Sequence, residues 1–203
     1  MFLLRSDSMK LGLLSLVCMW FSALCIGCAS DLASDLVSDQ EAQVDLSSVL
    51  EGSDGDLVVV VFTSVDCPVG NAMSPQLGRT LAHARDHDVR AFLVYPRTST
   101  SYADIALHMK DYRLTGVSLR DPDKRLVTLL DARITPEAFL LELDGSGGWR
   151  VAYRGRINDL YASIGNRRDE PSRLDLQIAI DQTLSGAWPD VTVTEAVGCL
   201  IER

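Results

Sequence analysis

Hydrophobic positions along the chain form continuous runs in some places and helical spacings in others, which predicts an α/β protein. The run LVVVVF at residues 57–62 is apolar and largely β-branched, which is typical of a strand buried on both faces. Residues 68–86 instead place apolar side chains such as Leu77 and Leu81 at helical spacing. A second apolar run, VRAFLVY at residues 89–95, predicts another buried strand. The order expected for this part of the chain is strand, helix, strand.

The pattern continues with a helix over residues 101–112, where Ser101 and Asp104 have the spacing of a capping box. Residues 137–143 and 150–153 are predicted strands, and the glycine-rich turn DGSGG between them predicts a hairpin. Two further helices are predicted, over residues 121–130 and 172–184. Two strand–helix units before an antiparallel pair imply a mixed β-sheet flanked by helices.

Composition narrows the class of protein. The chain has 203 residues, of which 47% are hydrophobic, and this is ordinary for one globular domain. Its net charge is −9, from 28 acidic and 19 basic residues. We expect no nucleic-acid partner, because such binding depends on neutralising phosphates with basic residues. Five cysteines are too few for a disulfide scaffold, so each is interpreted separately.

An uncharged apolar segment at residues 11–27 is typical of an export signal. A start at Met9 would leave a short basic region ahead of it. The segment runs into the sequence CIGC at residues 25–28, which resembles a bacterial lipobox. The resemblance implies cleavage before Cys28 and lipidation of that cysteine. An uncleaved anchor and an ordinary signal peptide cut nearby are the alternatives.

Residues 28–46 repeat Ser-Asp and Ala-Ser with little bulk, which is typical of a solvated tether. We therefore expect a signal peptide over residues 1–27, a flexible tether over residues 28–46, and one domain with a C-terminal tail over residues 47–203. The expected location is the periplasmic or cell-surface side, with a lipid anchor in the membrane.

Cys67 is the strongest candidate for chemistry. It follows the first predicted strand and precedes a helix, at the edge where open α/β sheets bind ligands. Unpaired N–H groups and the positive end of the helix dipole favour a thiolate there, which lowers the pKa of a cysteine and makes it a nucleophile. The alternative is a small buried cysteine that packs as a hydrophobe. The flanking Asp66 and Pro68 favour the reactive interpretation.

The segment LVVVVFTSVDCPVGNAMSPQL resembles the active-site segment of thioredoxin-like proteins, and in particular their redoxin branch. Cys67 and Pro75 match the first motif cysteine and the helix proline of that family. Gly70 stands where the second cysteine of the C-x-x-C motif would be, so the internal resolving thiol is absent. Ser64, three residues before Cys67-Pro68, also resembles the peroxiredoxin pattern.

The resemblance extends through LRDPDKRLVTLLDARITPEAFLLELDGSG and covers roughly residues 50–155. It implies a thioredoxin-like α/β fold in which Pro136 is cis and faces Cys67. The backbone of Thr135 would then be free to pair with an extended substrate. The alternative is a trans proline that begins a strand, which is common.

The resemblance further implies an exported thiol-dependent oxidoreductase that needs no cofactor. Cys67 would attack a peroxide or a protein disulfide, and an external thiol would reduce it again. A peroxiredoxin also needs an arginine beside its cysteine to stabilise the leaving oxygen. The candidates for that arginine are Arg133, Arg154 and Arg156.

Cys199 lies near the end of the chain, in TEAVGCLIER. If Cys28 is lipidated and the segment before it is removed, Cys67 and Cys199 are the remaining cysteines. Cys199 would then be a resolving or metal-binding thiol that a returning tail brings to Cys67, for which the Cα atoms must approach within about 7 Å. The alternative is a free, partly buried cysteine in a terminal strand.

A binding module is the rival to an enzyme. His108 lies on the second predicted helix, from which it would reach the edge of the sheet that carries Cys67. A site of Cys67, His108 and Cys199 would suit copper(I) or zinc. The alternative function is therefore a non-catalytic thioredoxin-fold module that binds copper or assists metal or haem maturation.

Overall fold

The computed structural model describes residues 49–202. The expected signal peptide, the expected lipidation site Cys28 and the expected tether lie outside these residues. Among residues 49–202, no helix is both long and apolar enough to cross a membrane.

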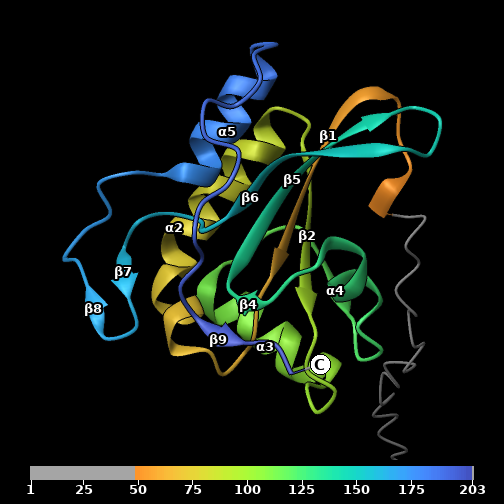
Figure 1. Ribbon diagram of the computed structural model, residues 1–203. Coiled ribbons are helices and arrows are strands. Elements are labelled where there is room, and N and C mark those ends of the chain that lie inside the picture. The colour runs from red at the N-terminus through yellow and green to blue at the C-terminus, as the bar shows by residue number, and fades with distance from the viewer. Residues whose placement is uncertain (1–48, 203) are drawn as a thin grey trace, which may run out of the picture. The chain divides into compact units, whose positions relative to one another are not determined.

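A five-stranded mixed sheet forms the centre of the domain, with the strand order β3-β2-β1-β5-β6 (Figure 1). β1 is the middle strand and is parallel to β2, which is parallel to β3. On its other side β1 is antiparallel to β5, and β5 is antiparallel to β6. The five strands are β1 (Asp54–Phe62), β2 (Arg90–Tyr95), β3 (Val117–Arg120), β5 (Glu137–Asp144) and β6 (Trp149–Gly155).

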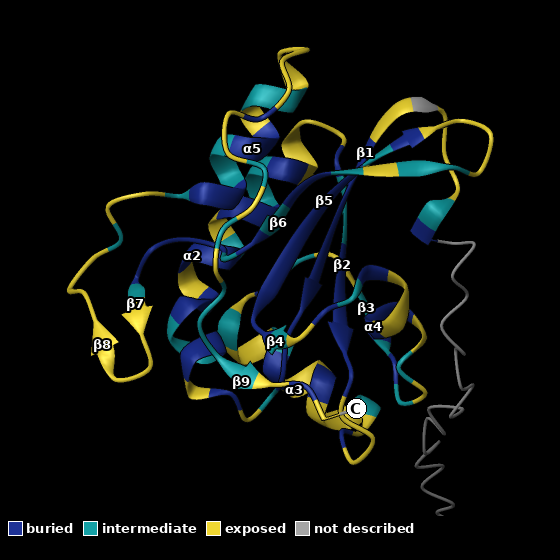
Figure 2. Ribbon diagram, viewed as in Figure 1, coloured by how far each residue is buried: buried dark blue, intermediate teal, exposed yellow. Residues whose placement is uncertain are grey.

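The β-branched run of β1 explains why this strand is central. Val58 to Phe62 are completely buried, and alternate side chains belong to two different apolar clusters. One cluster joins Val59 and Val61 to three helices, which are α2 (Pro68–Asp86), α3 (Tyr102–Tyr112) and α5 (Asp175–Leu184). The other joins Val58 and Val60 to α4 (Arg125–Leu130). Helices therefore cover both faces of the sheet, and burial is concentrated between the layers (Figure 2).

Two small strand pairs lie outside the main sheet. β7 (Tyr161–Ser163) and β8 (Asn166–Arg167) form an exposed hairpin. β4 (Ile134–Thr135) pairs antiparallel with β9 (Cys199–Leu200), which lies at the C-terminal end of the chain. The second pair matters for function because β4 lies immediately before β5 at the edge that carries Cys67.

The structure confirms the predicted α/β fold, a central mixed sheet flanked by helices, and most of its elements. α2 has the predicted bounds, and Ser101 and Asp104 form the predicted capping box at the start of α3. The prediction was wrong about the start of α4, which begins at Arg125 rather than at residue 121. The buried Asp121 carboxylate instead accepts hydrogen bonds from two backbone N–H groups of α4, so this residue lies ahead of the helix and caps it.

Two other differences have physical reasons. β3 was not predicted, because it is a four-residue edge strand in which only Leu119 is buried. α5 begins at Asp175 rather than at residue 172. The Asp159 carboxylate accepts hydrogen bonds from the backbone N–H groups of Ser172 and Arg173, which holds those residues in a loop ahead of the helix.

Candidate active site: a cysteine pair beside β4

Cys67 is the N-cap residue of α2 and lies in the loop that follows β1. Its sulfur accepts a hydrogen bond from the backbone N–H of Gly70 at 3.4 Å. The Cys67 thiol also donates to the carbonyl oxygen of Thr135 at 3.0 Å. The residue is 1% exposed, so protein atoms surround this sulfur on nearly every side. A thiolate here would gain from the N–H groups at the start of the helix.

Cys199 is the residue that covers Cys67. The two sulfur atoms are 2.9 Å apart, although 132 positions separate the residues in sequence. Both are free thiols, and Cys199 is partly exposed. The structure therefore brings together the two cysteines that the sequence left open as a pair. Little movement is needed to join them, because their sulfurs are already in contact.

The C-terminal tail reaches Cys67 in two steps. It first runs beside β6, where the backbone N–H of Thr194 donates to the Arg154 carbonyl at 3.0 Å. It then pairs with β4, with Thr135 opposite Cys199 in the register. Gly198 permits this approach, because a Cβ atom there would lie 2.1 Å from the Thr135 carbonyl oxygen. A larger residue would push the tail away from β4.

The environment of Cys199 disfavours its thiolate. Burial raises the pKa of this thiol to about 11, and the hydrogen bond and charge of Cys67 act in the same direction. The Asp66 carboxylate also raises the pKa of Cys199, whereas the Arg97 guanidinium lowers it. Cys199 is therefore protonated near neutral pH, which leaves Cys67 as the candidate nucleophile.

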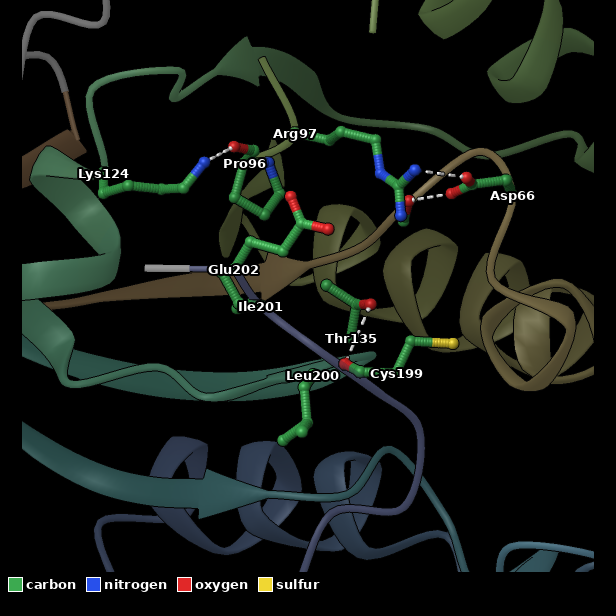
Figure 3. Close-up of a pocket in the computed structure, with 10 residues that line it drawn as sticks. Asp66, Pro96, Arg97, Lys124, Thr135, Cys199, Leu200, Ile201 and Glu202 are labelled. Atoms are coloured by element: carbon green, nitrogen blue, oxygen red, sulfur yellow. Dashed lines mark hydrogen bonds and ion pairs between the residues drawn. The ribbon is translucent and has the colours of Figure 1, made fainter. Parts of the chain in front are cut away.

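A small cavity of about 70 Å³ opens beside Cys199 (Figure 3). Its charged rim includes Arg97, which forms an ion pair with Asp66 at 2.9 Å, and Lys124, which donates to the carbonyl of Pro96. The residues that line it are Ser64, Asp66, Pro96, Arg97, Lys124, Thr135, Cys199, Leu200, Ile201 and Glu202.

The other predicted site residues have specific placements. The Thr135–Pro136 peptide bond is cis, and Pro136 is buried. The Thr135 backbone was expected to be free for a substrate, but it pairs with the chain's own tail. Ser64 was a candidate site residue through its resemblance to the peroxiredoxin pattern, and its hydroxyl donates to the carboxylate of Asp66. Ser64 therefore orients the loop before Cys67 rather than contacting the sulfur.

The three arginines suggested for peroxide chemistry are engaged elsewhere. Each forms an ion pair with a carboxylate: Arg133 with Asp131, Arg154 with Glu137, and Arg156 with Asp175. These pairs explain their positions without any role at Cys67. The guanidinium that does line the cavity with Cys199 belongs to Arg97, which sequence reasoning missed. It follows β2, and β2 is parallel to β1, so the two strands end at the same edge of the sheet.

His108 does not join the two cysteines in a metal site. Its Nδ1 is 2.9 Å from the Tyr95 hydroxyl, and its Nε2 is 3.0 Å from the Asn71 amide oxygen. The amide nitrogen of Asn71 in turn donates to the carbonyl of Val65, in the loop before Cys67. Burial lowers the pKa of His108. Within residues 49–202, no group of three or more metal-ligating side chains is assembled.

Comparison with known proteins agrees with the fold. A hypothetical protein from Sinorhizobium meliloti is 21% identical, with a TM-score of 0.63 over 73% of this chain and 80% of that chain. An uncharacterized conserved protein from Geobacillus kaustophilus is 19% identical, with a TM-score of 0.64 over 78% and 81%. A secreted disulfide oxidoreductase from Mycobacterium tuberculosis is 16% identical, with a TM-score of 0.43 over 69% and 85%.

No protein-family model and no curated protein matches the chain. At the identities found among solved structures, the likeness establishes the fold and not the reaction. The chemistry therefore rests on the geometry of Cys67, Cys199 and their neighbours.

Proposed function

We propose that this protein is a thiol–disulfide oxidoreductase whose redox couple is Cys67 and Cys199. The observation that carries the proposal is the 2.9 Å separation of the two sulfurs at the N-terminus of α2. Gly70 stands where the second cysteine of the helix motif would be, and the tail supplies a second thiol through the pairing of β9 with β4. Cys67 is the nucleophile, and Cys199 is the resolving thiol.

The reaction begins when the Cys67 thiolate attacks one sulfur of a substrate disulfide. A Cys67–substrate disulfide forms, and the other substrate sulfur leaves as a thiolate that takes a proton from water. Cys199 then loses its proton to solvent and attacks the Cys67 sulfur. The second substrate thiolate leaves and is protonated, and a Cys67–Cys199 disulfide remains. The substrate has gained two electrons and two protons, and an external dithiol restores the protein by the reverse exchange.

A protein disulfide is a better substrate for this site than a peroxide. Peroxide reduction needs a cation that stabilises the leaving oxygen beside the attacking sulfur. Arg133, Arg154 and Arg156 are paired with carboxylates, and Arg97 is paired with Asp66. Disulfide exchange does not need a cation beside the attacking sulfur, because its leaving group is a thiolate.

The test compares the wild type with two single variants in the reduction of insulin by dithiothreitol. We expect Cys67→Ser to lose the catalysed rate. Cys199→Ser is expected to accumulate a covalent complex with the substrate, visible on a non-reducing gel, because the resolving step is blocked. A Cys67→Ser variant as active as the wild type would contradict the proposal. Faster consumption of hydrogen peroxide than of insulin disulfides would replace it with peroxidase chemistry.

We also propose that the domain is exported and held to a membrane by lipid on Cys28, which rests on the apolar segment and the lipobox-like sequence. Detergent, but not salt, is then expected to release the protein from membranes. Cys28→Ala is expected to abolish the lipid-modified N-terminal peptide in mass spectrometry. An unmodified N-terminus at another residue in the wild type would contradict this proposal.

A further inference from the structure

The backbone edge beside Cys67 is occupied by the chain itself. β9 pairs antiparallel with β4, so that Ile134 faces Leu200 and Thr135 faces Cys199. The backbone N–H of Ile201 extends the pairing by donating to the Arg133 carbonyl at 2.9 Å. An extended peptide that adds to a strand edge gains affinity from such backbone hydrogen bonds. The tail thus makes the contacts that a bound peptide would make.

Side chains of the tail alternate as those of a docked strand do. Cys199 faces the Cys67 sulfur, and Leu200 points away from the protein with 79% of its surface exposed. Ile201 is only 9% exposed and packs into the apolar cluster that contains Phe62. Glu202 lines the cavity beside Cys199 (Figure 3). Specificity in strand addition comes from such alternate pockets.

Two cations lie on the rim of the same cavity as Glu202, namely Arg97 and Lys124. Lys124 donates to the backbone carbonyl of Pro96, and its positive charge also acts on the Asp121 carboxylate. A carboxylate three positions after the reacting cysteine therefore lies in a cavity with two cationic side chains, of which Arg97 is also paired with Asp66. An aliphatic side chain two positions after that cysteine meets the pocket that Ile201 fills.

We propose that β9 is a tethered mimic of the substrate, and that the natural substrate is an extended protein segment in which the reacting cysteine is followed by an aliphatic residue at +2 and an acidic residue at +3. The proposal rests on the thiol–disulfide function. It adds the chemical class of the substrate and the way in which the substrate reaches Cys67. The substrate segment replaces β9 on β4, and its cysteine takes the place of Cys199 against Cys67.

The tail has the features of a displaceable segment. Thr194 stays anchored on β6 by its backbone hydrogen bond and by its hydroxyl, which is 2.6 Å from the Tyr153 hydroxyl. Residues 195–198 are exposed or only partly buried and connect this anchor to β9. A short tether keeps its segment at an effective concentration on the order of millimolar, so a peptide at about 10 μM competes poorly with it. Loosening β9 is therefore expected to admit a peptide.

Gly198→Ala is the sharpest perturbation, because the new Cβ would lie 2.1 Å from a backbone oxygen of β4. Val193→Ala is the matched control, since Val193 lies on the same tail before the anchor and is 64% exposed. Both changes are made in the full chain with Cys199→Ser and with Cys18, Cys25 and Cys28 replaced by serine, so that Cys67 is the reacting thiol. Ile201→Ser is a second way to loosen β9 if Gly198→Ala lowers the thermal stability of the whole domain.

The probe is the synthetic peptide Val-Gly-Cys-Leu-Ile-Glu-Arg, with its cysteine carried as a 2-thiopyridyl disulfide. Release of pyridinethione reports attack by Cys67. We expect Gly198→Ala to raise the second-order rate at least about tenfold over the same background without it, because the tethered competitor is removed. Val193→Ala is expected to stay within about twofold of that reference. Replacing the peptide's Ile by Ser or its Glu by Lys is expected to reverse most of the gain.

The outcomes separate the two proposals. Equal rates for Gly198→Ala and Val193→Ala, with Cys67 reactive in both, would overturn the tethered mimic and leave the redox function standing. Equal reaction of all three peptides with the loosened variant would overturn the tethered mimic in the same way. If Cys67 attacks neither the peptide nor a small aromatic disulfide in any variant, the redox function itself fails.

Discussion

The raised pKa of Cys199 gives a quantitative prediction about its reactivity. The pKa of this thiol is raised from 9.0 to about 11, with burial as the largest cause. At pH 8 a thiol with the ordinary value is about 10% thiolate, and one with a pKa of about 11 is about 0.1% thiolate. A more basic thiolate is intrinsically more nucleophilic, which recovers roughly tenfold of that hundredfold difference. Cys199 is therefore expected to react about tenfold more slowly than an ordinary thiol.

The perturbation that tests the cause is Cys67→Ala. It removes the hydrogen bond and the charge of Cys67 and leaves most of the burial in place, so the pKa of Cys199 is expected to fall while staying above 9.0. Asp66→Asn is expected to lower it as well, because a negative charge is lost. Arg97→Gln is expected to raise it, because the opposing positive charge is lost.

The assay is the rate of iodoacetamide alkylation between about pH 7 and pH 11.5, with the Cys199 peptide quantified by mass spectrometry. Asp169→Asn removes an exposed carboxylate in the loop between β8 and α5 that is not among the causes of the Cys199 shift, so this control is expected to leave the profile unchanged. An inflection at or below about 9 in the wild type would refute the assignment of a buried, paired thiol. An unchanged inflection in Cys67→Ala would refute the coupling between the two cysteines.

Three further predictions concern stability, each measured by urea unfolding. Burial lowers the pKa of His108, so the unfolded chain binds a proton at a higher pH than the folded protein does. The free energy of unfolding is therefore expected to fall as the pH drops below about 6.5. His108→Gln is expected to flatten this dependence between about pH 7 and pH 5. Asp121→Ala is expected to cost about 1–3 kcal/mol, because two backbone N–H groups of α4 lose their acceptor. Leu140→Ala is expected to cost about 2–5 kcal/mol, because this fully buried side chain of β5 leaves a cavity. A loss of unfolding free energy below about 0.5 kcal/mol for Asp121→Ala or for Leu140→Ala would contradict the contacts described for that residue.

The sequence was most informative where local chemistry decides the structure. The β-branched run of β1 and the capping box of α3 depend on neighbouring residues, and both are found as predicted. The start of α4 was misplaced because Asp121 acts through its side chain rather than as a helical residue. β3 was missed because an edge strand shows little hydrophobic pattern.

The candidate site was predictable in part. The position of Cys67 follows from a strand that ends where a helix begins, which is a local signal. The meeting of Cys67 with Cys199 depends on the register between β4 and β9, and a single sequence does not carry such long-range pairing. Gly198 is the one sequence feature that pointed toward this pairing, because a glycine beside a cysteine permits close approach to another backbone. Asn71, which links His108 to the loop before Cys67, gave no such signal.

Peptide mapping of the protein after mild oxidation with a small disulfide reagent tests the redox couple without any substrate. If Cys67 and Cys199 form the couple, the product is a monomer lighter than the reduced protein by two hydrogens, in which the peptide containing Cys67 is linked to the peptide containing Cys199. Dithiothreitol is expected to reverse the link, and Cys199→Ser is expected to prevent it. Two free thiols after oxidation of the folded wild type, or a link found only between chains, would contradict the proposed couple.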